Sequence, residues 1–143
     1  MSTDQGFEII LQEDTVCLHA KGKNLKELFR NALRGLTMFI KPDALAQNRK
    51  EKKEKRLIAV EAVDIHSLLI EFLTQVVAQA ELHGLAFTNV IFKTLGDNFL
   101  EAELFGIAAG EFEKEIKAVS YSAVDIKRNE ESGLYETTLV FEI

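Results

Sequence analysis

At 143 residues the chain has the length of about one domain, enough to bury a single hydrophobic core. Hydrophobic residues at 47% and charged residues at 28% are ordinary globular values, and a net charge of −6 argues against general nucleic-acid binding and favours a protein partner. The first residues form no basic or apolar leader, no apolar run reaches membrane-spanning length, and the lone Cys17 has no disulfide partner. We therefore expect a soluble, cytoplasmic, single-domain protein (residues 1–143).

The first quarter of the chain predicts a β-hairpin followed by a helix. Apolar and polar residues alternate in residues 7–12 and 15–20, on either side of a polar corner at Glu13 and Asp14. Asn24 with Glu27 three residues later resembles a capping box, which predicts a helix start. Lys41 and Pro42 end this helix. Its apolar face comprises Leu25, Leu28, Phe29, Ala32, Leu36, Phe39 and Ile40.

A basic segment lies in the stretch 43–55, which has no clear periodicity and is predicted to be a linker. The sequence RKEKKEKR, residues 49–56, carries six basic and two acidic residues. One interpretation is a solvated loop or helix end. The other is an arm that contacts phosphates, because clustered cations release counterions from a polyanion. Without interleaved aromatic residues such an arm supplies affinity and no sequence readout.

The remaining elements predict an α+β fold. Residues 57–62 form a strand, Asp64 caps a second helix that ends at Gly84, and residues 85–95 and 99–107 form a hairpin. Residues 114–143 read as two long strands folded back on each other, with a turn at residues 129–133 in which Gly133 takes positive φ. We expect two helices packed on one side of a mainly antiparallel β-sheet.

Few residues suggest chemistry by their spacing. The chain has no GxGxxG, P-loop, HExxH, CxxC or GxSxG motif, and we expect structural roles for His19, His66 and His83. No nucleophile, base and orienting group can be assembled, so a stand-alone enzyme is not expected. Acidic groups occur at two places: the corner at Glu13 and Asp14, and the end at Glu142 and the carboxylate of Ile143. One interpretation is an oxygen-ligand set for Ca²⁺ or Mg²⁺. The other is a solvated acidic rim.

Four stretches carry a resemblance to a known family. GKNLKELFRNAL from Gly22, DIHSLLIEFLTQVV from Asp64, EIKAVSYS from Glu115 and the closing LVFEI resemble archease in order along nearly the whole chain. The resemblance implies an SHS2-type α+β fold and no enzymatic activity of its own. It also implies a protein cofactor for the guanylate-dependent RNA ligase of tRNA splicing and RNA repair, one that promotes guanylylation and turnover of the ligase and uses a divalent-metal site.

The resemblance has departures at the implied metal site. Thr15 occupies the position of the family's ligand aspartate, although Asp14 is one residue away, and Glu142 stands at the family's penultimate aspartate. We therefore expect a site of Asp14, Glu142 and Ile143 with weak or absent binding of Ca²⁺ or Mg²⁺, because affinity follows the number of charged ligands.

Two further positions bear on the partner. Lys117 matches the lysine of the family's KAVTYH segment and is implied to contact the partner, whereas Ser122 replaces its histidine. The implied partner is an RNA ligase, with RNA contacted only through it and no membrane involved; the oligomeric state stays open. The alternative is a diverged SHS2-type protein-binding module that has lost the metal site.

Overall fold

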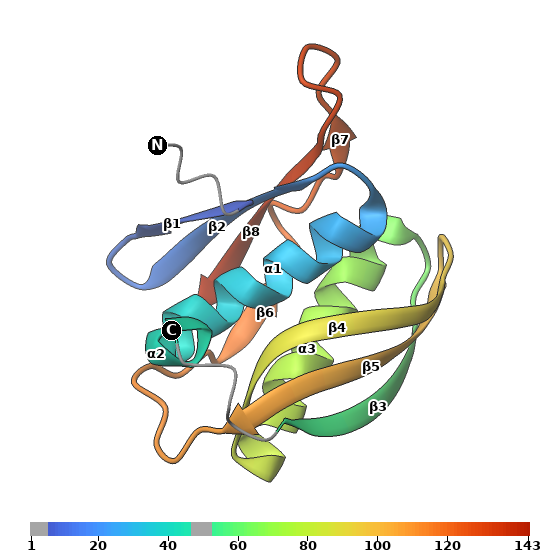
Figure 1. The fold of residues 1–143 in the computed structure, drawn as a ribbon. Helices are drawn as coiled ribbons and strands as arrows, with labels where there is room; N and C mark the ends of the chain where they lie inside the picture. Colours follow the sequence, from blue (N-terminus) through green and yellow to red (C-terminus); the bar gives the residue numbers. More distant parts are fainter. Residues whose placement is uncertain (1–5, 47–52) are drawn as a thin grey trace.

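The strands form two separate antiparallel sheets with helices between them (Figure 1), in a computed structural model that describes residues 6–46 and 53–143. Sheet A has the order β1-β2-β8-β6, with β7 also paired to β8, and sheet B has the order β3-β5-β4. The elements are β1 (Phe7–Leu11), β2 (Thr15–Gly22), α1 (Leu25–Ile40), α2 (Pro42–Ala46), β3 (Glu54–Glu61), α3 (Ile65–His83), β4 (Leu85–Leu95), β5 (Phe99–Ala108), β6 (Ala118–Ser120), β7 (Lys127–Arg128) and β8 (Tyr135–Glu142). The predicted α+β class is confirmed.

The single sheet expected from the sequence is wrong, and side chains of α1 explain why. They donate hydrogen bonds to main-chain oxygens on the free side of β4: Thr37 Oγ1 to Phe87 (2.6 Å), Arg34 Nη1 to Thr88 (2.9 Å) and Arg30 Nη2 to Val90 (3.2 Å). These oxygens would otherwise be open to pairing with another strand. The helix therefore closes this edge of sheet B, and sheet A lies on the other side of α1, where β2 contacts it.

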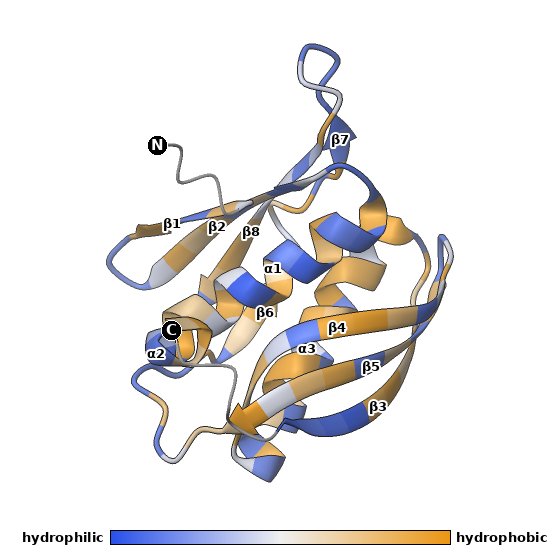
Figure 2. Ribbon diagram, viewed as in Figure 1, coloured by the Kyte–Doolittle hydropathy of each residue, from blue (hydrophilic) through white to orange (hydrophobic). Residues whose placement is uncertain are grey.

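An aromatic cluster joins the helices to sheet B at the centre of the core. Phe29 of α1, Phe72 of α3 and Phe92 of β4 have ring centroids 5.6 to 6.0 Å apart, within the range of favourable aromatic pairs. Hydrophobic positions recur along the strands of both sheets and along the helices (Figure 2), and buried residues from all of these elements belong to the same cluster. None of the helices in residues 6–46 and 53–143 has the length and hydrophobicity of a transmembrane span.

The predicted helix ends are confirmed. Asn24 Oδ1 accepts a hydrogen bond from Glu27 N (2.9 Å), and the Glu27 carboxylate accepts one from Lys23 N (2.8 Å), one residue before the cap. At the start of α3, Asp64 Oδ1 accepts from Ser67 N (2.8 Å). Gly84 ends α3 with a left-handed φ of 63°, which glycine adopts without strain.

The linker is shorter than predicted. Pro42 begins the short helix α2, where a missing N–H costs nothing, and β3 begins at Glu54, three residues before its predicted start. Charged residues continue the strand because β3 is an edge strand with a solvated side, and Lys55 Nζ lies 3.6 Å from Glu103 Oε2 of β5. Part of the basic segment, residues 49–52, lies outside the described residues.

The two long strands expected in residues 114–143 are partly wrong. β8 is long, but its expected partner is divided into β6 and β7, which pair with opposite ends of β8. Side chains hold the chain between them: Asp125 N donates to Thr137 Oγ1 (3.1 Å) and Ile126 N to His66 Nδ1 (3.0 Å). These bonds replace a continuous ladder, which residue alternation alone does not reveal. The predicted turn is confirmed, with Gly133 at φ 76°.

Candidate functional site

The ends of three strands meet at one end of sheet A, which we call the β8 edge: Asp14, Thr15, Lys117, Ala118, Glu142 and Ile143. Glu142 closes β8, the central strand, and lies opposite Thr15 of β2 on one side and Ala118 of β6 on the other. Directly opposed residues in antiparallel strands point to the same face. Thr15, Ala118 and Glu142 therefore share the outer face of sheet A, while their neighbours Val16, Val119 and Phe141 are buried.

Main-chain hydrogen bonds bring the other candidate residues to the same edge. Ile143 N donates to Asp14 O (3.3 Å), and Lys117 N donates to Glu142 O (2.7 Å). Asp14, Lys117, Glu142 and Ile143 thus lie together although they come from opposite parts of the sequence. The placement depends on the β2–β8 pairing, which joins strands more than a hundred residues apart.

The charged side chains of the β8 edge are exposed. Within the part of the chain that the structure describes, Asp14, Lys117 and Glu142 make no side-chain hydrogen bond or ion pair. Thr15 differs, because its hydroxyl donates to Gln12 Oε1 (3.0 Å) within the hairpin corner. The edge therefore offers a lysine and two carboxylates to a partner with no internal bond to break first.

The donor set at this edge does not fit a divalent cation held by protein side chains. Ca²⁺ takes six to eight oxygen ligands, and its affinity depends on how many are charged. Among residues 6–46 and 53–143, no three His, Cys, Asp or Glu side chains come close enough to hold a metal ion. Thr15 also lies directly opposite Glu142, in the register where the resemblance places an aspartate, and no bulge shifts Asp14 into that position.

The EIKAVSYS segment continues from the β8 edge onto α3. Ile116 and Val119 are buried, whereas Tyr121 extends outward and its hydroxyl donates to a carboxylate oxygen of Glu71 on α3. Ser122, at the family's histidine position, hydrogen-bonds Ser120 (2.8 Å). This segment is therefore anchored at both ends, which fixes the backbone of Lys117 at the edge.

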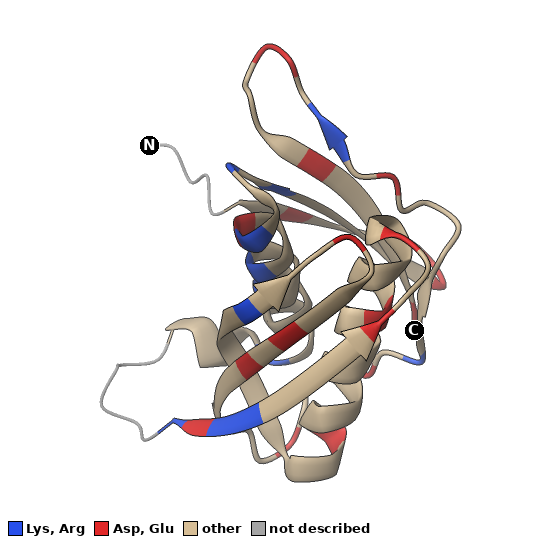
Figure 3. Cartoon of the chain, turned by 90° about the vertical axis from the view of Figure 1, so that its right-hand side faces the viewer, with Lys and Arg blue, Asp and Glu red and all other residues tan. Residues whose placement is uncertain are grey.

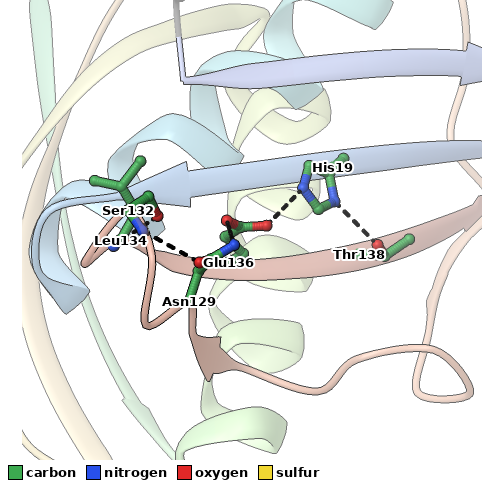
Figure 4. Close-up of polar contacts among 6 residues, drawn as sticks. All are labelled: His19, Asn129, Ser132, Leu134, Glu136 and Thr138. Atoms are coloured by element: carbon green, nitrogen blue, oxygen red, sulfur yellow. Dashed lines mark hydrogen bonds and ion pairs between the residues drawn. The ribbon is translucent and has the colours of Figure 1, made fainter.

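A second polar cluster lies on the same outer face, farther along β2 and β8 (Figure 4). His19 Nδ1 lies 3.2 Å from Thr138 Oγ1, and its Nε2 lies 3.3 Å from Glu136 Oε1. Asn129 Nδ2 donates to the other oxygen of Glu136 (3.1 Å). Sequence patterns did not indicate this cluster, because His19 meets Glu136 and Thr138 only through the β2–β8 register. The cluster ties the turn at residues 129–133 to β2, so for His19 a structural role accounts for every contact.

Nearly the whole chain matches a known protein family. The model of the archease protein family matches residues 8–143. The chain belongs to the archease family. Proteins named archease from Methanosarcina acetivorans and Aeropyrum pernix are 27% and 26% identical to it over 136 residues. These alignments cover 89% and 90% of this chain and 90% of each relative. An archease from Methanosarcina mazei is 26% identical over 151 aligned positions, which span 99% of both chains.

Solved structures share the archease fold with this chain. Protein 1598 of Methanobacterium thermoautotrophicum superposes with a TM-score of 0.69 at 20% identity, covering 97% of this chain and 99% of the other. A Thermotoga maritima protein described as an archease and possible chaperone gives a TM-score of 0.61 at 17% identity, covering 94% of each chain. The two-sheet arrangement is thus the fold of known archease structures.

Proposed function

We propose that this archease-family protein is an accessory factor of a guanylate-dependent RNA ligase in cytoplasmic tRNA processing or RNA repair. In this proposal it is not an enzyme itself, and it promotes guanylylation and turnover of the ligase by binding to it. Family membership over residues 8–143 supports the class of activity. The observation that carries the proposal is the β8 edge, where Lys117 and Glu142 are adjacent, exposed and not paired with described residues.

Electrostatic complementarity is the means by which this edge would recognise the ligase. A nucleotide-transfer site holds phosphates and cationic side chains, so an exposed lysine and an exposed carboxylate on an ordered backbone can contact both. Lys117 is fixed by its main-chain bond to Glu142 O (2.7 Å), and Glu142 by its place in β8 between β2 and β6. The backbone of both residues is therefore ordered before binding, and only the freedom of their side chains is lost when the ligase binds.

The proposal is tested by multiple-turnover RNA ligation with a cognate ligase, GTP and a cleaved RNA. The protein is expected to raise the turnover rate. Lys117→Ala is expected to weaken the stimulation by about tenfold, equivalent to ~1.4 kcal/mol of contact free energy. Lys114→Ala is the matched control, because Lys114 is exposed three residues away and outside the β8 edge. Equal stimulation by both variants would contradict the role of Lys117.

In this proposal no step needs a metal ion held by this protein, and the lack of any group of three His, Cys, Asp or Glu side chains among residues 6–46 and 53–143 supports that part of it. We propose that Ca²⁺ and Mg²⁺ bind weakly or not at all. Glu142 then acts through its negative charge toward the ligase. Calorimetric titration with either cation tests this, and saturable binding lost in Glu142→Gln would contradict it.

The second candidate is a protein-binding module of the same fold without ligase activation. Thr15 and Ser122, which replace the metal-ligand aspartate and the histidine implied by the resemblance, favour it, because both are engaged in local hydrogen bonds. Stable co-purification with a ligase without any change in its turnover would support this candidate over the first.

A further inference from the structure

A basic hollow lies at the opposite end of β2 from the β8 edge. It has a volume of about 500 Å³ and is bordered by the end of β2, the start of α1 and the residue before β8. Its lining, which we call the α1 pocket, consists of Gly6, Lys21, Gly22, Lys23, Glu27, Arg30, Asn31, Arg34 and Leu134. Four of these residues are basic and one is acidic, in a chain whose net charge is −6. The local charge is therefore opposite to that of the whole protein.

Both arginines of the α1 pocket donate to main-chain oxygens of β4. Arg30 Nε and Nη2 donate to Val90 O (3.3 and 3.2 Å), and Arg34 Nη1 donates to Thr88 O (2.9 Å). For Arg30, the Val90 oxygen orients the guanidinium without neutralising its charge. Arg30 uses two of its five N–H groups in this way, so further donors remain for an anion. Figure 3 shows the basic positions along α1.

Two further contacts organise the lysines. Asn31 Nδ2 donates to Lys21 O (2.8 Å), which fixes the main chain of β2 beside the helix. Lys23 lies in the connection between β2 and α1, is exposed, and its ammonium makes no ion pair with a described residue. The Glu27 carboxylate is already bonded to Lys23 N. The pocket thus combines the oriented guanidinium of Arg30 with the exposed ammonium of Lys23, a pattern that suits phosphate oxygens.

We propose that the α1 pocket binds the phosphate backbone of single-stranded RNA. Among the described residues that line it, none is aromatic, so bases have no stacking surface and binding is expected to be independent of sequence. The choice of RNA rests on the proposed function, in which the partner ligase acts on cleaved RNA. Direct binding of RNA by this protein differs from the sequence-based expectation that RNA is contacted only through the ligase.

The position of the pocket is compatible with contact to RNA and ligase together. Gly22 pairs with Tyr135 at one end of β2, and Thr15 pairs with Glu142 at the other, so the two sites are seven residues or roughly 23 Å apart along the strand. This separation lets one end of sheet A face the ligase while the other end contacts an RNA strand that extends from the ligase.

The test is fluorescence anisotropy of a short labelled single-stranded RNA titrated with the protein alone, at several salt concentrations. Wild type is expected to bind in the micromolar range at low salt. Lys23→Gln should weaken binding by about threefold to tenfold and reduce the slope of log K against log salt by about 0.7, the loss of one phosphate contact. Lys26→Gln removes the same charge from an exposed position of α1 outside the pocket and should leave both values nearly unchanged.

Two outcomes would overturn the proposal: no RNA binding by wild type, whether or not inorganic phosphate binds, or equal losses in Lys23→Gln and Lys26→Gln. Thermal unfolding of each variant shows whether the fold is intact. Because the assay contains no ligase, its failure leaves ligase stimulation standing. Loss of stimulation in the turnover assay with RNA binding preserved would instead reject the proposed function alone.

Discussion

At the scale of single residues, Thr15 decides what the β8 edge can hold. It lies directly opposite Glu142, and directly opposed residues have Cβ atoms about 5 Å apart. An acidic residue at position 15 would therefore bring a second carboxylate close to that of Glu142. In this chain the hydroxyl instead donates to Gln12 within the hairpin corner. The side chain at position 15 therefore decides whether this face of the β8 edge has two carboxylates, as a candidate cation site needs, or only that of Glu142.

Thr15→Asp is predicted to create divalent-cation binding. The new carboxylate repels Glu142, so the variant should be less stable than wild type without metal and should gain thermal stability when Ca²⁺ is added, since binding to the native state stabilises it. Thr15→Asn is the matched control of similar shape without charge. Calorimetry should give a saturable Ca²⁺ signal for Thr15→Asp alone. A signal of equal strength in wild type would contradict this account.

Asp64 predicts a pH dependence of stability. Two contacts lower the pKa of Asp64 below its usual 3.8: the hydrogen bond from Ser67 N, which has the larger effect, and a hydrogen bond with the Ser67 side chain. Because the folded pKa is below the unfolded pKa, the contribution to stability is complete above the unfolded pKa and is lost as pH falls through the folded pKa. Urea unfolding should thus give a stability advantage of wild type over Asp64→Ala that shrinks below about pH 4. An advantage that stays constant to pH 2 would contradict this.

At the scale of elements, the fold depends on α1 satisfying the free edge of β4. Thr37, Arg34 and Arg30 lie at spacings of three and four residues, so they share one face of the helix. Periodicity places apolar residues on the core face of α1 correctly, yet it cannot show that polar residues beside that face cap a strand. For this reason the sequence predicted the two long helices and most strands, but it missed α2 and predicted one sheet where there are two.

Thr37→Val is predicted to lower the free energy of unfolding by about 1–3 kcal/mol, because it leaves the buried Phe87 oxygen without its donor. Thr74→Val is the matched control, since the Thr74 hydroxyl bonds Ile70 O on an exposed face of α3 and should matter by less than about 0.5 kcal/mol. Urea midpoints measure both. Equal losses in the free energy of unfolding for the two variants would contradict a specific contribution from the hydrogen bond between Thr37 and the Phe87 oxygen.

At the scale of the whole molecule, the chain presents two different surfaces along one strand. The β8 edge carries an exposed lysine and carboxylates, and the α1 pocket, at the other end of β2, is basic. The residues of the first surface were predicted from the sequence because the family resemblance named them; their roles stay predictions. The α1 pocket and the His19 cluster could not be predicted, since their members meet only through β2–β8 pairing and the docking of α1 on β4.

The measurement that tests the central claim most directly is the multiple-turnover ligation assay with wild type, Glu142→Gln and Glu131→Gln. Glu131 is exposed in the turn before β8, far along that strand from the β8 edge, so its variant controls for loss of one negative charge. The account predicts stimulation by wild type and Glu131→Gln and a loss of about tenfold or more with Glu142→Gln, equivalent to ~1.4 kcal/mol. Full stimulation by Glu142→Gln, or none by wild type, would contradict it.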